Sequence, residues 1–554
     1  MRYYELIRVY NEIRSKSGRL DKVEIISKFI KNLKDDELKE IIYLLQGKVF
    51  ADNDSRKTGV NEKIVIKALS IISGENEKEI EKIWSKKGDL GEISEELIKK
   101  KKQSALFEKK LDVEKVVNNI KKLSESIGDG AVNRKLQLIN ELLSNCNGEE
   151  AKYITRTLLE NMRIGIQDGV IRDSIAQAFD KKVEDIQKAN DLLNDYGEVA
   201  IKAKNNDLEN IDLKIGKPVK VMLAVIFTSV EESFEALGEK VQVEEKLDGF
   251  RVIIHKDKNV KLFTRNLEDV TNQFPDVVET IKEIKEDKFI LDSEVVGYDK
   301  KTGKYLPFQN ISIRIKRKYD IEKMQEEYPV EINVFDILYY KKNLMDNTLK
   351  ERREVLEKII KEKKGKIKLT KKIISDNKKE IEKFFENALK NGREGIMVKN
   401  LDSLYKPGRY VNGWGKLKKI LEPLDLVIVK AEYGTGKRAG SLTSFTLSCK
   451  DKDNYLEVGK VSTGVKEKDD ELTYAELTKL LKPLIIREHE KMIDVKPKII
   501  LEIGYEEIQK SSAYTSGYAL RFPRVLRLRN DKDLNEINTI KDVEKIYNSQ
   551  TKIR

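Results

Sequence analysis

The spacing of apolar residues in the first 200 positions predicts helices. Up to about residue 203, apolar residues recur at intervals of three and four, and no proline occurs. This pattern is typical of amphipathic helices. In residues 153–166, for example, Ile154, Leu158 and Met162 would share one helix face, with Arg156 and Arg163 off that face. The sequence therefore predicts an all-α domain over residues 1–205.

The pattern changes after a polar stretch near residue 206. Apolar and polar residues alternate in short runs at 241–245, 251–256 and 260–265, which predicts strands, and a helical pattern covers 349–364. From about residue 423 strands follow at short intervals, up to a helical tail at 542–550. The predicted fold class is multidomain: an all-α domain, an α+β domain over 206–422 and a C-terminal β-barrel over 423–554.

Composition limits the classes of protein that the chain can belong to. Its 554 residues, 39% apolar and 37% charged, are too many for one hydrophobic core and suit several soluble domains. No stretch approaches the ~20 apolar residues of a membrane span, and the start lacks the apolar core of a signal peptide. We therefore expect a cytoplasmic protein that does not bind membranes.

Cysteine content and charge narrow the range further. Two cysteines and two histidines exclude a four-cysteine zinc module and make a disulfide framework implausible. The net charge of +12 would attract polyanions such as nucleic acid, although a general lysine bias accounts for it equally well. Charge alone does not decide between these explanations.

The segment 241–256 contains the sharpest chemical signal. It places Lys246, Asp248 and Gly249 between two predicted strands, so that the connecting loop would present the lysine from a rigid scaffold. Lys246 is a candidate nucleophile, provided that its neutral amine is favoured by burial or by neighbouring cations. Taken alone, Lys-x-Asp-Gly fits an ordinary surface turn better.

The residues that follow suggest a nucleotide site. Arg265 ends a predicted strand and could hold a phosphate or a sugar hydroxyl. Asp292 and Glu294 share one strand face and could bind a divalent metal or a ribose, or simply form the wet face of the strand. Phe335 could stack on a base or be a core residue.

Three lysines come last in this series. Glu394 and Lys399 lie in one short segment, and in residues 413–419 Trp414 shares a face with two lysines while Leu417 points the other way. These two lysines are Lys416 and Lys418. Lysines that point into one site need an anion to offset their repulsion.

The order of these motifs is more specific than any one of them. Lys-x-Asp-Gly-x-Arg, a strand arginine, Asp-x-Glu, Phe-Asp, Glu-Gly-x-x-x-Lys and Trp-x-Lys-x-Lys follow one another, and this is the motif set of the covalent nucleotidyltransferases. Segments such as LPFQNISIRIKRKYD, GSLTSFTLSC, GKVSTGV and SGYALRFPRVLRLRNDK resemble ATP-dependent DNA ligases of the archaeal and eukaryotic replicative type. The upstream segments KKGDLGEISEEL and YITRTLLENMRIGIQDGVIRDSIAQAF resemble the helical DNA-binding domain of that family.

The resemblance implies a fold, an activity and a set of binding residues. The three domains would be a DNA-binding, an adenylation and an OB-fold domain, and the enzyme would seal nicks in DNA replication, repair and recombination through a lysyl-AMP intermediate. Lys246 would be the catalytic nucleophile, Glu294 and Glu394 would bind Mg²⁺, with Mn²⁺ as a substitute, and ATP would be the cofactor. The implied ATP-binding set is Glu244 at the adenine amino group, Phe335 on the ring, Arg251 and Arg265 at ribose and phosphate, Glu294, Lys399, Trp414, Lys416 and Lys418 around the phosphates, and Arg527, Arg529 and Lys532 at the pyrophosphate.

The resemblance also implies partners. Nicked duplex DNA would bind the helical domain near Arg163, Gly165 and Gly169, although a plain helical hairpin is the alternative for that segment. Gln103, Leu106 and Phe107 loosely resemble a sliding-clamp-binding peptide or form an ordinary connection between helices. We expect a monomer.

The chain departs from the commoner family pattern at three positions. Leu247 replaces an aromatic residue, Gly415 stands where leucine is common, and Thr264 replaces serine. An RNA ligase or an mRNA-capping nucleotidyltransferase remains the main alternative, although neither carries the upstream helical domain. An NAD-dependent ligase is disfavoured because its zinc finger needs more cysteines, and a purely DNA-binding scaffold would not need the phosphate-facing residues.

Overall fold

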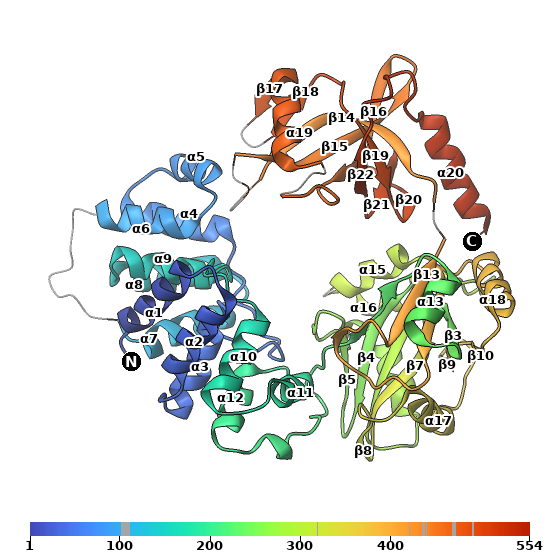
Figure 1. Ribbon diagram of the computed structural model, residues 1–554, viewed down its shortest axis with the longest axis horizontal. Helices are drawn as coiled ribbons and strands as arrows, with labels where there is room; N and C mark the ends of the chain where they lie inside the picture. The colour runs from blue at the N-terminus through green and yellow to red at the C-terminus, as the bar shows by residue number, and fades with distance from the viewer. Residues whose placement is uncertain are drawn as a thin grey trace. The chain divides into compact units, whose positions relative to one another are not determined.

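The structure, a computed structural model, describes residues 1–100, 111–317, 319–419, 421–434, 438, 440–467, 472–489 and 492–553. The chain divides into two compact units, and Figure 1 labels their helices and strands. The first comprises Met1–Gly59, Asp112–Glu125 and Glu160–Lys419, and the second Val60–Leu111, Ser126–Leu159 and Ile420–Arg554.

The first 205 residues are helical, as the apolar spacing predicts. The helices of the first unit are α1 (Tyr3–Ser15), α2 (Arg19–Ile30), α3 (Asp35–Leu45), α7 (Val113–Lys122), α10 (Asp168–Ala178), α11 (Val183–Leu193) and α12 (Tyr196–Lys204). Those of the second unit are α4 (Glu62–Ser73), α5 (Glu77–Lys87), α6 (Leu90–Lys100), α8 (Ala131–Ser144) and α9 (Gly148–Leu158). Asn61, Asp112, Asn147 and Asp195 begin four of these helices with side chains that accept a backbone N–H bond.

Helix α9 corrects one detail of the sequence interpretation. Arg156, expected off the apolar face, is buried, and its Nη2 donates to the Asp89 carboxylate at 2.6 Å. A buried charge of this kind is tolerated only when it is paired. The helix ends at Leu158, so the buried Met162 lies in the turn that follows rather than on the same helix.

The α+β part of the first unit holds two main sheets. Its strands are β1 (Met222–Leu223), β2 (Val225–Ile226), β3 (Val241–Lys246), β4 (Phe250–Lys256), β5 (Val260–Thr264), β6 (Phe289–Gly297), β7 (Val330–Tyr340), β8 (Lys342–Asn343), β9 (Ile367–Leu369), β10 (Lys372–Ser375), β11 (Gly395–Asn400), β12 (Gly408–Arg409) and β13 (Trp414–Lys418). One sheet has the order β10-β3-β11-β13-β2 and the other β5-β4-β6-β7-β8, with β9 paired to β7. The helices are α13 (Val230–Leu237), α14 (Pro275–Lys282), α15 (Phe308–Lys316), α16 (Ile321–Glu327), α17 (Leu349–Ile359) and α18 (Lys378–Lys390).

One face of the five-stranded sheet forms a hydrophobic core. Val243, Ile396 and Leu417, on three neighbouring strands, pack in one cluster with Val230 of α13 and Ile381 of α18. Since side chains alternate along a strand, the intervening residues must lie on the other face. That other face carries the candidate functional site.

The C-terminal part of the second unit is rich in strands. It contains β14 (Leu424–Tyr433), β15 (Leu442–Asp451), β16 (Asn454–Val461), β17 (Ile485–His489), β18 (Met492–Val495), β19 (Ile500–Gly504), β20 (Glu507–Lys510), β21 (Tyr518–Arg521) and β22 (Arg524–Leu528), with the helices α19 (Tyr474–Leu481) and α20 (Ile540–Ile553). β14 lies between β15 and β18 and also pairs with β19, which in turn pairs with β22. The predicted tail helix is present, whereas the sequence interpretation did not include α19.

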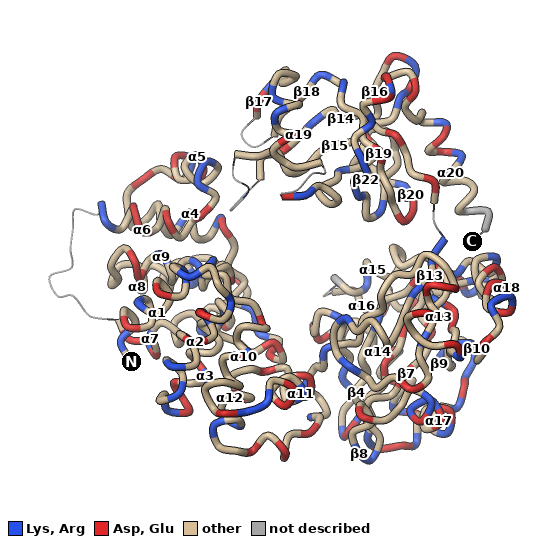
Figure 2. The backbone as a smooth tube through the Cα atoms, viewed as in Figure 1, with Lys and Arg blue, Asp and Glu red and all other residues tan. Residues whose placement is uncertain are grey.

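The predicted order of a helical, an α+β and a strand-rich domain is thus confirmed. The boundaries at 205/206 and 422/423 remain predictions. Figure 2 shows Lys and Arg interspersed with Asp and Glu in both the helical and the strand-rich parts of the described chain. Within the described residues, no helix is both long enough and apolar enough to cross a bilayer.

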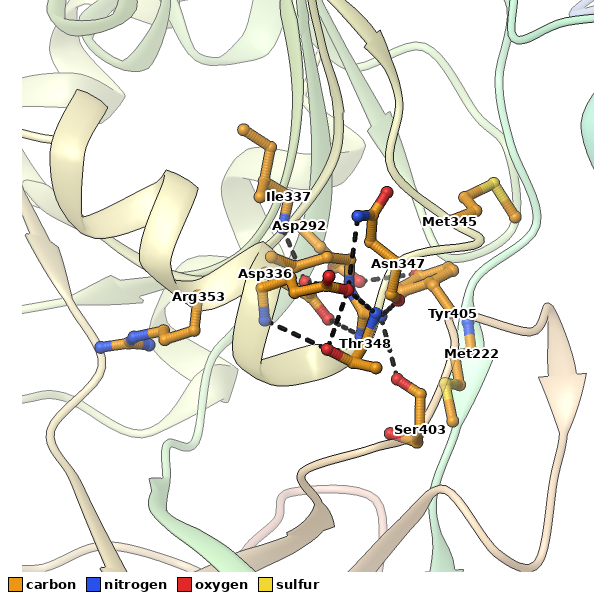
Figure 3. Close-up of polar contacts among 12 residues, drawn as sticks. Met222, Asp292, Asp336, Ile337, Met345, Asn347, Thr348, Arg353, Ser403 and Tyr405 are labelled. Carbon is orange, nitrogen blue, oxygen red and sulfur yellow. Dashed lines mark hydrogen bonds and ion pairs between the residues drawn. The ribbon is translucent and has the colours of Figure 1, made fainter.

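A buried ion pair fixes the direction of β7 against α17. Arg352 donates through Nε and Nη2 to the two oxygens of Asp336, at 2.8 and 2.9 Å, and both side chains are fully buried. Arg352 also donates to the carbonyls of Asn347 and Ser403 (Figure 3). Asp336 is therefore a structural anchor.

Breaking this pair tests its contribution to stability. Arg352→Met is expected to lower the free energy of unfolding by about 3–5 kcal/mol, because it leaves the Asp336 carboxylate buried without its cation. Denaturant unfolding can be followed by Trp414 fluorescence after Trp84→Phe removes the other of the two tryptophans. Lys28→Met, which breaks an exposed pair with Glu24, should leave the transition in place. An equal, small effect of both substitutions would contradict the assignment.

Candidate functional site

Three strands of the first unit bring nine residues to one face of a sheet. β3 and β13 both pair antiparallel with β11, and their registers align three rows. Residues two apart share a face of a strand, so all nine side-chain positions point the same way. We call this set the nine-residue face; its rows are Lys246–Gly395–Lys418, Glu244–Met397–Lys416 and Gln242–Lys399–Trp414.

Lys246 lies in the first row, at the end of β3 rather than in the loop that the sequence suggested. Its Nζ donates to the carboxylate of Glu394, and Lys418 pairs with the other oxygen of the same carboxylate. Burial favours the neutral form of Glu394, but the charges of Lys246 and Lys418 outweigh it and lower the pKa of Glu394 to about 2. The Lys246 Nζ is thus engaged by a carboxylate that remains ionised, and the amine must be free of that contact before it can attack.

A second ion pair lies directly beside the first. Arg393 Nε donates to Glu245 at 2.9 Å, and the Arg393 guanidinium stacks on the Tyr305 ring with its Cζ 4.4 Å from the centroid. β3 supplies the carboxylate of this pair and the cation of the Lys246–Glu394 pair, so the two ion pairs are oriented in opposite directions. They fix the end of β3 against the start of β11.

Glu244 lies deeper, in a fully buried polar cluster. Lys399 Nζ donates to Glu244 at 2.7 Å, and Gln242 Nε2 donates to the other carboxylate oxygen at 2.6 Å. The Lys399 ammonium also lies over two rings, 4.7 Å from the centroid of Phe335 and 4.4 Å from that of Trp414. The structure therefore brings these predicted residues together, although Glu244 is only 1% exposed.

Arg251 is held by a network that the sequence did not reveal. It contacts Asp292 through Nε at 2.9 Å and Nη2 at 2.5 Å, and Nη1 donates to the Met222 carbonyl at 2.6 Å. The Tyr405 hydroxyl donates to Asp292 at 2.7 Å (Figure 3) and lies 3.2 Å from Arg251 Nη2. These contacts use four of the five guanidinium N–H groups, which leaves one on Nη1 for a ligand.

Tyr405 has no motif signal of its own. It is buried in a loop before Trp414 and packs edge-on against that ring, with 5.7 Å between centroids. Burial and the Asp292 charge raise the pKa of Tyr405 well above its usual value, so that it remains a hydrogen-bond donor.

The carboxylates of the site suit a hard cation bound together with phosphate. Burial raises the pKa of Glu294 to about 7, against the charges of Lys246 and Arg251, and the nearby Glu394 raises it further. Among the described residues, no cluster of three or more His, Cys, Asp or Glu side chains could hold a metal unaided. Magnesium, however, is commonly bound by one or two carboxylates plus substrate phosphates. Glu294 and Glu394 fit that arrangement.

Arg265, predicted to hold a phosphate or a sugar hydroxyl, is not part of the nine-residue face. Arg265 is exposed in the turn after β5, which ends one residue earlier, at Thr264. The Thr264 hydroxyl accepts from the backbone N–H groups of Asn266 and Glu268 at 3.3 Å. Thr264 therefore keeps the hydroxyl that a serine would supply, and this hydroxyl stabilises the turn.

Gly415 has a clear packing reason. A Cβ atom built there would lie 1.9 Å from the ring of Phe227. The aromatic ring occupies the space that a side chain at 415 would need. Leu247, the other departure from the family pattern, is simply buried.

The cations of the last motif lie in the second unit. Arg527 contacts Glu502 at 2.8 and 3.2 Å, Arg529 contacts Asp425 at 2.8 and 2.9 Å, and Lys532 contacts Asp425 at 2.6 Å. Arg529 also donates to Asp531 at 2.7 and 2.9 Å. These residues thus form one cluster within this unit.

The segment between α9 and α10 has an unusual backbone. Glu160, Arg163 and Gly165 all have positive φ, a conformation that non-glycine residues adopt mainly under local constraint. Lys22 supports the turn by donating to the carbonyls of Ile164 and Gly165 at 3.0 and 3.1 Å.

Helix α10 follows this turn directly. Its N-cap residue, Gln167, makes no side-chain capping bond, and the N-terminus of a helix is a favourable place for an anion. Gly169 lies in this first helical turn rather than in the connecting turn.

Comparisons with known proteins assign the chain to a class. Residues 2–176 match the family "DNA ligase N terminus", 221–418 match "ATP dependent DNA ligase domain" and 438–532 match "ATP dependent DNA ligase C terminal region". The nine-residue face thus lies in a domain of the ATP-dependent ligase class.

Full-length relatives make the assignment specific. The DNA ligase of Nanoarchaeum equitans is 46% identical over 561 residues, covering 99% of both chains, and that of Thermococcus fumicolans is 40% identical and covers both chains fully. The solved structure "Pmar-Lig_PreS3" has a similar fold, with a TM-score of 0.57 at 18% identity over 95% of this chain and 99% of its own. The chain belongs to the ATP-dependent DNA ligases. Nick sealing is the reaction of this family, and the RNA-ligase and capping alternatives are not favoured.

The raised pKa of Glu294 generates a prediction about stability. Because its folded pKa of about 7 exceeds the unfolded value near 4.5, the folded protein binds more protons between these pH values. The free energy of unfolding therefore falls as pH rises through this window. Glu294→Gln removes the free-energy cost of burying the ionised carboxylate. It should therefore raise the melting temperature at pH 8, by roughly 2–4 °C for each kcal/mol of that cost, and much less at pH 5.

Calorimetry in EDTA-containing buffer at the two pH values measures this difference. Glu235→Gln on the exposed side of α13 is the control and should change neither melting temperature. If Glu294→Gln raised the melting temperature more at pH 5 than at pH 8, the ionised Glu294 carboxylate would not be the group that destabilises the folded protein.

Proposed function

We propose that Lys246 is the residue that becomes adenylated when this ligase reacts with ATP. The observation that carries the proposal is the nine-residue face, on which Lys246, Lys416 and Lys418 point the same way, with Lys246 and Lys418 on the Glu394 carboxylate. The neutral Nζ attacks the α-phosphorus of ATP. An N–P bond forms, the bond from the α-phosphorus to the bridging oxygen breaks, pyrophosphate leaves and the amine proton passes to solvent.

The surrounding side chains suit this step. Lys416 and Lys418 offset charge on the α-phosphate, Arg251 offers its remaining N–H group to the ribose, and Phe335 stacks on the adenine. Glu244 accepts from the adenine amino group, since a carboxylate has acceptor sites beyond the two that Lys399 and Gln242 occupy. Lys399, Trp414 and Arg265 complete the proposed ATP-binding set.

Magnesium is part of the proposal, with manganese as a substitute. Glu294 and Glu394 would hold the ion, which offsets phosphate charge when bound. Their own contribution is to place two carboxylates beside Lys246. A cation held there would compete with Lys246 for the Glu394 carboxylate, which accepts the Lys246 hydrogen bond.

The last motif acts from the second unit in this proposal. Arg527, Arg529 and Lys532 orient the departing pyrophosphate when the strand-rich domain closes over ATP, and they withdraw once Lys246 carries AMP. This is a conformational gate. AMP then moves to the 5′-phosphate of a nick, and the 3′-hydroxyl displaces it to seal the strand.

The helical domain is proposed to hold the nicked duplex. Arg163 and Gly165 in the turn, and Gly169 in the first turn of α10, would face phosphates, and the uncapped helix start supports this. Such contacts imply little sequence preference. Action as a monomer in cytoplasmic replication, repair and recombination belongs to the same proposal. The sliding-clamp contact at Gln103, Leu106 and Phe107 lies outside the described residues.

Labelled ATP tests the nucleophile directly. Incubation with α-labelled ATP and Mg²⁺ should give an acid-labile label on the chain, and a nicked duplex should discharge it and yield a sealed strand. Lys246→Ala should carry no label, whereas Lys261→Ala, on strand β5 of the other sheet, should be labelled normally. Persistent labelling of Lys246→Ala would overturn the assignment.

Salt dependence tests the proposed DNA contacts. Arg163→Ala should weaken binding to nicked and intact duplex alike and reduce the slope of log affinity against log salt by about one. Formation of lysyl-AMP in the absence of DNA should remain normal. Lys182→Ala, an exposed lysine at the start of α11, should leave the slope unchanged; equal slopes for both variants would exclude Arg163 from the interface.

A further inference from the structure

Two cations of the last motif converge on one carboxylate, that of Asp425. Arg529 Nη1 lies 2.8 and 2.9 Å from its two oxygens, and Lys532 Nζ lies 2.6 Å from one of them. Asp425 comes from β14, about a hundred residues earlier in the chain. No motif in the sequence singles it out.

Asp425 is held rigidly, whereas its partners are not part of a strand. Its N–H donates to the Asn538 side chain at 2.7 Å, its carbonyl accepts from the Asn538 N–H at 3.0 Å, and the residue is buried. Arg529 and Lys532 lie beyond the end of β22, at Leu528. Long cationic side chains lose much rotamer freedom when they are ordered, and Asp425 supplies the fixed point that orders both.

The charges around Asp425 are arranged at a cost. Asp425 lies directly opposite Glu502 across β14 and β19, and like charges in that position repel. Arg527 lies opposite Glu502 on β22, and Arg529 reaches Glu502 at 3.5 Å. An apolar pair at these positions would serve stability better, so the two carboxylates are better explained by the cations that they hold.

We propose that Asp425 is a positioning residue for the adenylation step, which fixes Arg529 and Lys532 in the arrangement that meets the pyrophosphate. This inference rests on the function proposed above for the last motif. Asp425 does not touch the nucleotide. It acts through the two cations.

Two effects of Asp425 have opposite signs. As an anion near an anion-binding segment it weakens attraction for the triphosphate, whereas as an anchor it keeps the cations in a productive geometry. If positioning dominates, removal of the charge slows adenylation. If repulsion dominates, removal of the charge speeds adenylation or tightens ATP binding.

Asp425→Asn in the full-length chain separates these outcomes. Single-turnover formation of lysyl-AMP over a range of ATP concentrations should show a maximal rate reduced about tenfold or more, with little change in the ATP concentration for half-maximal rate. Sealing of a nick that already carries AMP on its 5′-phosphate should proceed within about twofold of the wild-type rate, because pyrophosphate takes no part in it. A general loss of structure would affect both steps.

Matched variants identify the route of the effect. Glu457→Gln breaks an ion pair to Lys430 on the same strand β14 and should leave both steps unchanged. Asp425→Asn added to Arg529→Ala/Lys532→Ala should cause no further slowing of adenylation, since residues that act through one another are not additive. Additive losses would contradict the proposal.

The remaining outcomes each decide a point. Normal or faster adenylation by Asp425→Asn, with Arg529→Ala slow, overturns the role of Asp425 and retains that of the last motif. Normal adenylation by both Arg529→Ala and Lys532→Ala removes the proposed function of the motif itself. If Asp425→Asn loses both steps, Asp425→Glu decides: selective slowing of adenylation supports positioning, and equal loss of both steps contradicts it.

Discussion

The register of β3 and β13 on β11 is the constraint on which the site depends. Alternate residues of these strands go to the hydrophobic core with α13 and α18, and the others form the nine-residue face. A slip by one residue in any of the three strands would move its polar side chains into the core and its apolar ones to the surface. The burial of Val243, Ile396 and Leu417 therefore places Lys246, Lys399 and Lys416 as surely as any contact among the lysines.

Charge compensation is the second organising feature. The cations proposed to meet phosphate are held by carboxylates in this structure: Lys246 and Lys418 by Glu394, Lys399 by Glu244, and Arg529 by Asp425. Clustered cations would otherwise repel one another in the absence of nucleotide. The carboxylates keep the lysines and arginines in place, and each phosphate must compete with a partner that is already bound. In the proposed function, binding of ATP is therefore an exchange of one anion for another at these cations.

The sequence predicted the elements whose signals are local. Periodicity identified the helical region, and alternation identified β3 to β5 and β13, so the shared face of Trp414, Lys416 and Lys418 opposite Leu417 follows from spacing alone. Contacts between distant segments left no such signal. Three such contacts depend on tertiary packing: Tyr405 with Asp292, Asp425 with Arg529, and Asp89 with Arg156. Arg156 illustrates the limit, because a charged residue read as exposed becomes a core residue once a distant carboxylate neutralises it.

The contact between Phe227 and Gly415 links two positions that lie far apart in the chain. The ring fills the volume that a leucine at 415 would need, so neither position can be altered independently. An exchange of the Trp-x-Lys-x-Lys segment with a relative that carries leucine would fail unless the β2 region were exchanged with it. The two positions therefore constrain each other: a side chain at 415 is compatible only with a smaller residue at 227.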